Sequence, residues 1–81
     1  MKIVNNIKSF LYDKQYFINI FDNCVHVFNY LDLESFSDDY INLRMDTFKL
    51  RVKGSNLAIV KMEEREILVR GEISGVEMVN E

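Results

Sequence analysis

From about residue 16 to residue 79, apolar and polar side chains alternate along the chain with a period of two. This period places successive side chains on opposite faces of an extended strand, whereas an amphipathic helix repeats its apolar positions every three to four residues. A slip of one residue in strand pairing would turn every apolar side chain outward, so the alternation also fixes the register. The pattern therefore predicts a mainly β protein with one apolar sheet face.

Short polar segments divide this region into about seven expected strands, each pairing with the next in an antiparallel meander. Gly54-Ser55 gives the strongest turn signal, because glycine readily adopts the positive φ that a type II′ turn requires at its first central residue. The weakest connection is residues 29–32. This register gathers one set of apolar side chains on a single face. They are Ile18, Ile20, Val25, Val27, Leu33, Ile41, Leu43, Met45, Phe48, Leu50, Val52, Leu57, Ile59, Ile67, Val69 and Ile73.

The opposite face of the expected sheet is mixed, with apolar side chains at its two ends. They are Phe17, Phe21, Cys24 and Phe28 at one end and Ala58, Val60 and Leu68 at the other. A sheet of this many strands twists and usually curls. A curl would bring the two ends together over a second, smaller core. Without it, they form exposed patches of the kind that binds a partner.

The residues before the alternation follow a helical period and predict an N-terminal amphipathic helix over about residues 2–13. Its apolar stripe is formed by Ile3, Val4, Ile7, Phe10 and Leu11. A chain of 81 residues makes a single domain, residues 1–81, with the meander over about 16–79. We expect the helix to cover the apolar sheet face, since nothing else in the chain seals it. Binding of the lysine-bearing helix to a membrane surface is the alternative.

A faint internal repeat suggests a second architecture. Leu50-x-Val52-Lys53-Gly54 recurs as Ile67-x-Val69-Arg70-Gly71. Regular spacing of this kind is typical of a short β-solenoid, in which similar coils stack on one another. Two weak copies are few for a solenoid, and successive hairpins account for both, so the meander remains the favoured fold.

Composition excludes several classes of protein. Ten basic and thirteen acidic side chains give a net charge of −3, which provides no general attraction to nucleic acid or to anionic membranes. The longest apolar run is residues 57–60, so we expect neither a transmembrane segment nor a secretory signal. The single cysteine excludes an internal disulfide framework, and the expected location is the cytoplasm. With one histidine and three glycines, we expect no enzyme and no cofactor.

Two groups of residues carry side chains of the kinds that bind metal ions. Cys24 and His26 lie two residues apart on one strand face, but a structural zinc site needs four ligands and the chain has no further cysteine or histidine. A buried thiol beside a surface imidazole is the favoured interpretation, ahead of a zinc site or a Cys-His nucleophile. The acidic residues Asp32, Glu34, Asp38 and Asp39 lack the ligand spacing of a calcium loop and are typical of turns.

Five basic residues, Arg44, Lys49, Arg51, Lys53 and Arg70, fall on the mixed face in the expected register. Together with nearby phenylalanines they suggest a small nucleic-acid-binding β domain as an alternative function. The net acidic charge instead favours a solvated face with cross-strand partners such as Glu66 and Glu72. An acidic protein partner suits the stripe equally well. The candidate interaction surface is formed by Val60 and Leu68, flanked by Lys49, Arg51, Arg70 and Arg44.

Three runs of the sequence resemble the YabP/YqfC sporulation-protein family. They are Tyr40-Ile41-Asn42-Leu43, the segment from Phe48 through Lys53-Gly54 to Ile59, and Glu66-Ile67-Leu68-Val69-Arg70-Gly71-Glu72-Ile73. Upstream, residues 21–23, 25–30 and 33–36 are similar to the YqfC branch, which also has a helical amino terminus. The resemblance covers about residues 16–79.

The resemblance implies a role in endospore formation, in the mother-cell compartment of a Gram-positive spore former. Members of the family look like structural or assembly factors, so the resemblance brings no catalytic residues. It implies a non-enzymatic protein that acts through protein contacts, either with itself or with a membrane-associated partner. The last strand of the meander is a candidate open edge for strand addition by a partner.

Overall fold

The computed structural model describes residues 16–80, which form one antiparallel sheet of six strands. The strands are β1 (Phe17–Phe21), β2 (Cys24–Phe28), β3 (Asp32–Phe36), β4 (Tyr40–Arg44), β5 (Lys49–Glu63) and β6 (Glu66–Val79). The predicted mainly β, antiparallel fold is confirmed. The β-solenoid alternative is wrong, because every pairing between these strands is antiparallel. The predicted helix over 2–13 lies outside the described residues.

The expected hairpin turn at Gly54-Ser55 is wrong, and this reduces about seven predicted strands to six. β5 continues through these residues as a single strand from Lys49 to Glu63. Leu50 therefore pairs with Leu43 of β4 and with Met78 of β6, rather than with Ile59 in a hairpin. At three further turns the adjacent strands pair as successive hairpins require: Ile18 lies opposite Val27, Leu33 opposite Leu43, and Ile59 opposite Val69.

The strands follow the order β1-β2-β6-β5-β4-β3, so the predicted meander is also wrong at one connection. β2 pairs with β6 instead of β3, and the change falls at residues 29–31, within the weakest predicted link. Asn29 adopts a φ of 63°, a left-handed conformation that asparagine tolerates. Its N–H donates to the carbonyl oxygen of Arg65 at 2.6 Å, and that of Leu31 donates to Arg44 at 2.8 Å. These bonds attach the connection first to the turn before β6 and then to β4.

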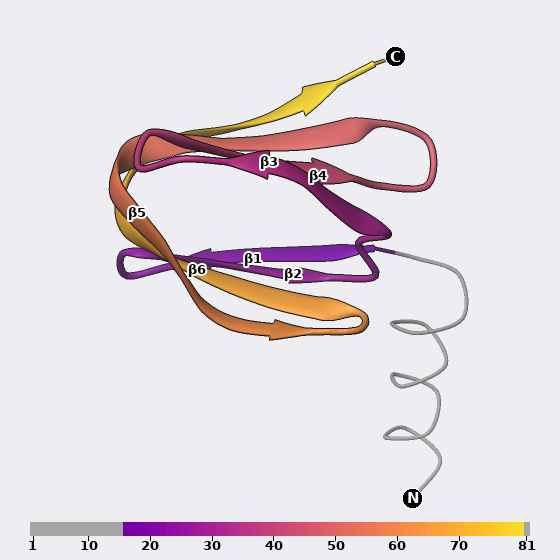
Figure 1. Ribbon diagram of the computed structural model, residues 1–81, viewed down its shortest axis with the longest axis horizontal. Helices are drawn as coiled ribbons and strands as arrows, with labels where there is room; N and C mark the ends of the chain where they lie inside the picture. Colours follow the sequence, from indigo (N-terminus) through magenta and orange to yellow (C-terminus); the bar gives the residue numbers. More distant parts are fainter. Residues whose placement is uncertain (1–15, 81) are drawn as a thin grey trace, which may run out of the picture.

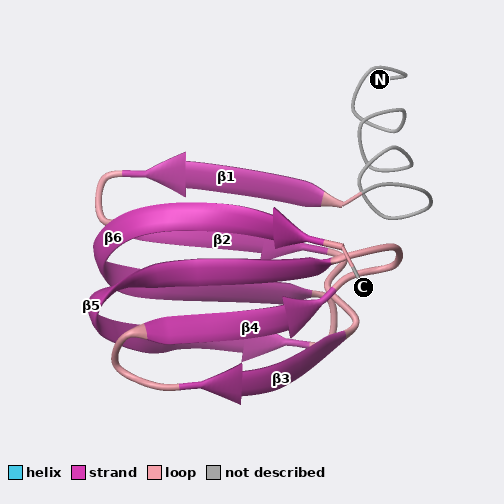
Figure 2. Ribbon diagram, turned by 90° about the horizontal axis from the view of Figure 1, so that it is seen from above, coloured by secondary structure: helices cyan, strands magenta, loops and turns pink. Residues whose placement is uncertain are grey.

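β5 and β6 bend together, so the sheet folds back on itself and forms two layers (Figures 1 and 2). The β1 layer contains β1, β2, residues 66–70 of β6 and residues 58–63 of β5. The β4 layer contains β3, β4, residues 49–53 of β5 and residues 75–79 of β6. The curled sheet is thus confirmed, and the two halves of one sheet cover each other.

The core between the layers is formed by the face that the alternation predicted. Its buried residues are Val25, Val27, Tyr30, Ile41, Leu43, Met45, Phe48, Leu50, Val52, Leu57, Ile67 and Val69, with Ile18, Leu33, Ile59, Ile73 and Val76 packed against them. Of the two alternatives left open for the opposite face, the second core does not form between the described strands, because the sheet bends toward its apolar face (Figure 1). Phe17, Phe21 and Val60 consequently lie on the outside and are exposed.

Glycines form the inner corners of both bends. A Cβ at Gly54 would overlap the carbonyl oxygen of Glu72, and a Cβ at Gly71 would lie 2.8 Å from the carbonyl oxygen of Asn56. Gly71 also has a φ of +154°, which side-chain-bearing residues rarely adopt. Glycine in a strand often marks such a bend or close approach of backbone. The faint repeat ending in Lys53-Gly54 and Arg70-Gly71 therefore marks the two corners of the folded sheet.

Two hairpin turns bond to these bends through backbone hydrogen bonds. The N–H groups of Gly54 and Leu57 donate to the carbonyl oxygens of Asp39 and Asp38, each at 2.9 Å. On the other bend, the N–H of Gly71 donates to the carbonyl oxygen of Asn23 at 2.9 Å. The turns after β1 and β3 thus extend the β2–β6 and β4–β5 pairings to the bends and satisfy backbone groups there.

Candidate interaction surfaces

The outer face of the β1 layer carries three rows of side chains, each crossing four strands. The rows are Phe17-Phe28-Glu66-Glu63, Asn19-His26-Leu68-Lys61 and Phe21-Cys24-Arg70-Ala58. These residues occupy the face opposite the core, because side chains alternate along each strand. Aromatic side chains gather on the β1 side of this face, and charged ones on the β5 side.

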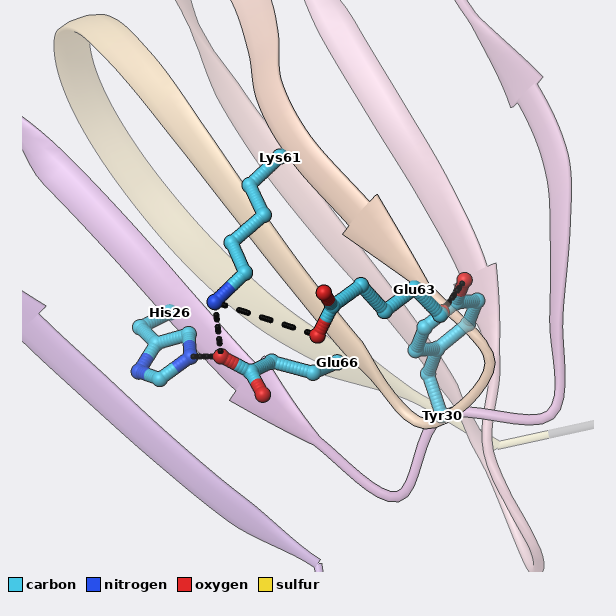
Figure 3. A network of polar contacts seen from close by, with 5 residues as sticks. All are labelled: His26, Tyr30, Lys61, Glu63 and Glu66. Atoms are coloured by element: carbon cyan, nitrogen blue, oxygen red, sulfur yellow. Dashed lines mark hydrogen bonds and ion pairs between the residues drawn. The ribbon is translucent and has the colours of Figure 1, made fainter.

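A polar network joins β2, β6 and β5 on the charged side of this face (Figure 3). His26 Nε2 lies 2.9 Å from Glu66 Oε1, and Lys61 Nζ approaches the same oxygen at 3.1 Å. Lys61 also lies 3.8 Å from Glu63 Oε1. Hydrogen bonds from His26 and then Lys61 hold the pKa of Glu66 below its usual value, and the bond to Glu66 raises the pKa of Lys61. The network links three neighbouring strands through one carboxylate.

Tyr30 lies at the end of this network, on the inner side of the sheet (Figure 3). Its side chain is buried, and its hydroxyl donates a hydrogen bond of 2.7 Å to the carbonyl oxygen of Glu63. Burial, and then the negative charge of Asp32, raise the pKa of the phenol. Tyr30 thus anchors the connection between β2 and β3 to the end of β5.

The aromatic side of the β1 layer is built around Phe28. Its ring centroid lies 4.8 Å from that of His26 and 6.3 Å from that of Phe17, both in tilted arrangements. Phe17 and Phe21 remain 39% and 46% exposed, although both lie on the outer face of a sheet strand. Large exposed aromatic side chains next to a polar network are a composition typical of protein contact surfaces.

The outer face of the β4 layer is polar, and three of its cations have partners within the sheet. Lys49 lies 3.3 Å from Glu34, and Lys53 lies 3.7 Å from Glu77. Arg51 Nε donates to Asn42 Oδ1 at 2.9 Å. The expected solvated face with cross-strand partners is confirmed, but the acids that meet these lysines are Glu34 and Glu77, not the predicted Glu66 and Glu72.

The bend divides the predicted interaction surface between the two layers. Arg44, Lys49 and Arg51 lie on the β4 layer, where Arg44 is opposite Lys49. Leu68 and Arg70 lie on the β1 layer, in two adjacent rows. Val60 belongs to the same layer, where the register shifts between Ile59 and Lys61, and it is 53% exposed. The structure thus keeps Val60, Leu68 and Arg70 together and separates them from the other three.

Cys24 and His26 point to the outer face of β2, as the alternation predicts. Cys24 is buried opposite Arg70, whereas His26 contacts Glu66. Among residues 16–80, no group of three or more histidine, cysteine, aspartate or glutamate side chains is placed to hold a metal ion. Within the same residues, no helix is long and apolar enough to cross a membrane.

These features define a small antiparallel β domain whose exposed elements are sheet faces and strand edges. The chain belongs to the YabP family, whose family model matches residues 18–81 and so spans the sheet apart from the first residue of β1. The match confirms the family resemblance, and family membership implies a sporulation-related role. The narrower assignment to the YqfC branch stays a prediction. No curated protein and no solved structure matches the chain.

Proposed function

We propose that this chain is a non-enzymatic structural or assembly protein of sporulation that acts through protein contacts. The observation that carries the proposal is the YabP family match over residues 18–81. The contact mode is supported by the outer face of the β1 layer, where Val60 is exposed close to Leu68 and Arg70. Isolated exposed apolar residues are common, but neighbouring ones on a sheet face favour a binding surface.

Protein contact is favoured over nucleic-acid binding by the pairing of charges on the β4 layer. Glu34 and Glu77 lie beside Lys49 and Lys53, so these cations are partly neutralised before any phosphate approaches. Single-strand binding needs a groove with a continuous positive potential. The separation of Arg70 from the other basic residues by the bend shortens the predicted stripe further.

The proposed site of action is the cytoplasm of the mother cell, with a membrane-associated protein as the partner. This follows the family resemblance, and no helix within residues 16–80 is long and apolar enough to cross a membrane. The partner would contact Val60 and Leu68 through apolar side chains and Arg70 through an acidic group. The complementary charge fixes the orientation of the contact more than its strength.

The experiment is complementation of a deletion strain of the spore-forming host. We expect deletion to lower the number of heat-resistant spores and the wild-type gene to restore it. Val60→Glu should fail to restore the number while the purified variant keeps the wild-type melting temperature. Leu31→Glu provides a matched control, because Leu31 is also about half exposed, at 52%, but lies in the connection before β3. Unchanged spore numbers after deletion, or full complementation by Val60→Glu, would contradict the proposal.

A further inference from the structure

β1 reads the same in both directions. Its residues are Phe17, Ile18, Asn19, Ile20 and Phe21. If two copies of this strand lie antiparallel around a two-fold axis through Asn19, Phe17 faces Phe21 of the second copy and Ile18 faces Ile20. Each residue then meets one of its own kind across the axis. Such self-complementarity is what an interface between two identical subunits requires.

β1 is also an edge of the described sheet, since it pairs only with β2. The direction of its free backbone groups follows from β2. Asn23 accepts a bond from Gly71 of β6, and Asn29 donates one to Arg65 just before β6, so both residues direct these backbone groups to the side of β2 on which β6 lies. Bonding direction alternates along a strand, so Cys24, His26 and Phe28 face β1.

Their partners Phe21, Asn19 and Phe17 therefore face β2. The N–H and C=O groups of Ile18 and Ile20 consequently point away from β2, toward the open edge of the sheet. In the two-fold pairing, Ile18 meets Ile20 of the second copy at these groups. Each such pair exchanges two N–H···O=C bonds, so the two pairs complete the ladder on both sides of Asn19.

The other edges of the sheet carry features that discourage pairing. β3 contains Asp32 and Glu34 and has a register shift between Leu33 and Ser35. Residues 58–63 of β5 contain Lys61 and Glu63 and also shift register. Residues 72–79 of β6 contain two glutamates. Charges and bulges are the usual means by which proteins block unwanted strand addition.

β1 has neither protection. All five of its residues are uncharged, and its pairing with β2 runs without a register shift. Ile20 is 58% exposed and Phe21 46% exposed, so apolar surface accompanies the free backbone groups. An edge strand such as β1, which is uncharged and apolar and has no bulge, is expected to pair with another chain.

We propose that two copies of this protein associate through β1, antiparallel and centred on Asn19, to form one continuous sheet. The two Asn19 side chains meet on the outer face, where each amide offers both a donor and an acceptor to the other. The phenylalanines of the two copies join in one aromatic surface on the same face. Because the pairing is two-fold, it uses the open β1 edge of each copy. No β1 edge then remains for a third copy, so association through β1 ends at a dimer. The inference goes beyond the proposed function, since it rests only on β1.

The test uses the purified full-length protein and measures its mass by light scattering and its dissociation constant by sedimentation over a concentration series. We expect the wild type to form a dimer. Asn19→Asp and Asn19→Lys each place two like charges on the two-fold axis, so each should raise the dissociation constant at least about tenfold, which corresponds to about 1.4 kcal/mol. An equimolar mixture of the two variants should recover the dimer, because opposite charges then meet.

Asn80→Asp is the matched control, because it makes the same chemical change at an exposed residue just after β6. It should leave the wild-type dissociation constant unchanged. A wild type that stays monomeric throughout the series would overturn the proposal. So would equal association of both Asn19 variants and the wild type, or a mixture that stays monomeric although each variant keeps the wild-type melting temperature. Spore counts do not enter this test, so its failure is separate from that of the proposed function.

Discussion

Gly54 of β5 lies so close to Glu72 of β6 that a Cβ at residue 54 would overlap the Glu72 carbonyl oxygen. The atoms of Glu72 that the added carbon would meet are the backbone carbonyl oxygen and carbon. Rotation of a side chain therefore cannot make room for it. β5 can approach β6 this closely at residue 54 because glycine has no side chain there. The close approach at this corner of the sheet therefore requires glycine at residue 54.

Replacing Gly54 with alanine should destabilise the protein by about 1–3 kcal/mol or more, the range for overpacking at a site that cannot relax. Urea denaturation measures this as a fall in the midpoint with little change in slope. Gly75→Ala is the control, because nothing lies within 4 Å of the Cβ it would add. Its effect should stay within about 0.5 kcal/mol. Equal midpoints for the two variants would contradict the role given to the corner.

Truncation of Leu43 to alanine should cost about 2–5 kcal/mol, because the side chain is fully buried between the layers and its loss leaves a cavity. Leu31→Ala removes the same atoms from a residue that is 52% exposed and should change stability by less than about 0.5 kcal/mol. Thermal denaturation followed by circular dichroism compares the two. A loss of stability for Leu43→Ala as small as that for Leu31→Ala would contradict the position of the core between the two layers.

The stabilising effect of Glu66 should depend on pH in a defined direction. Hydrogen bonds from His26 and Lys61 hold its pKa in the folded protein below the ordinary value of 4.5. The ionised form is therefore favoured by folding, and its contribution is present above pH 4.5 and is lost as the pH falls through the lowered value. The melting temperature of Glu66→Gln should lie below that of the wild type near neutral pH and approach it in acid.

Glu64→Gln makes the same change in the adjoining turn and controls for the general effect of removing a negative charge. Its difference from the wild type should be small and should vary little over the same pH range. If Glu66→Gln instead lost most stability in acid, the direction of the Glu66 pKa change would be wrong.

Tyr30→Phe keeps the ring but removes the hydroxyl that donates to Glu63, and should cost about 0.5–1.5 kcal/mol at neutral pH. The raised pKa of Tyr30 adds a second expectation. Folding favours the neutral phenol, so this contribution is complete below pH 10.0 and is lost as the pH rises through the raised value. The wild type should lose more stability than Tyr30→Phe above that pH in urea titrations, while the exposed Tyr40→Phe behaves like the wild type.

The core face was predictable from sequence because alternation is a local property of each strand. Val25, Leu43 and Val69 are buried whichever strands they pair with, since each lies on the apolar side of its own segment. The bend at Gly54 was not predictable in the same way. A glycine between polar neighbours gives the same local signal in a two-residue turn and at a corner, and only its contact with Glu72 distinguishes them.

The polar network was missed because its members come together only through the order of the strands. His26 and Glu66 are 40 residues apart in the chain and become neighbours through the pairing of β2 with β6. A meander would have placed β3 in that position. The predicted surface divided for a related reason, since Arg44 and Arg70 share a face in a flat sheet but lie on different layers of a folded one. The palindromic sequence of β1, residues 17–21, is visible in the sequence. Only the position of β1 at the edge of the described sheet indicates that it can pair with a second copy.

Both corners of the sheet belong to the hairpin of β5 and β6, and this determines how the chain can assemble. The hairpin closes at a short turn between Glu63 and Glu66, so its first contacts are local and form at little entropic cost. In the folded sheet, β2 pairs with β6 and β4 pairs with β5, so this hairpin joins the two halves of the sheet. The core lies between the two layers, and β6 contributes residues to both of them. We therefore expect a fragment that ends before β6 to form no stable folded structure. Folding during synthesis must therefore wait for nearly the last residue of the domain.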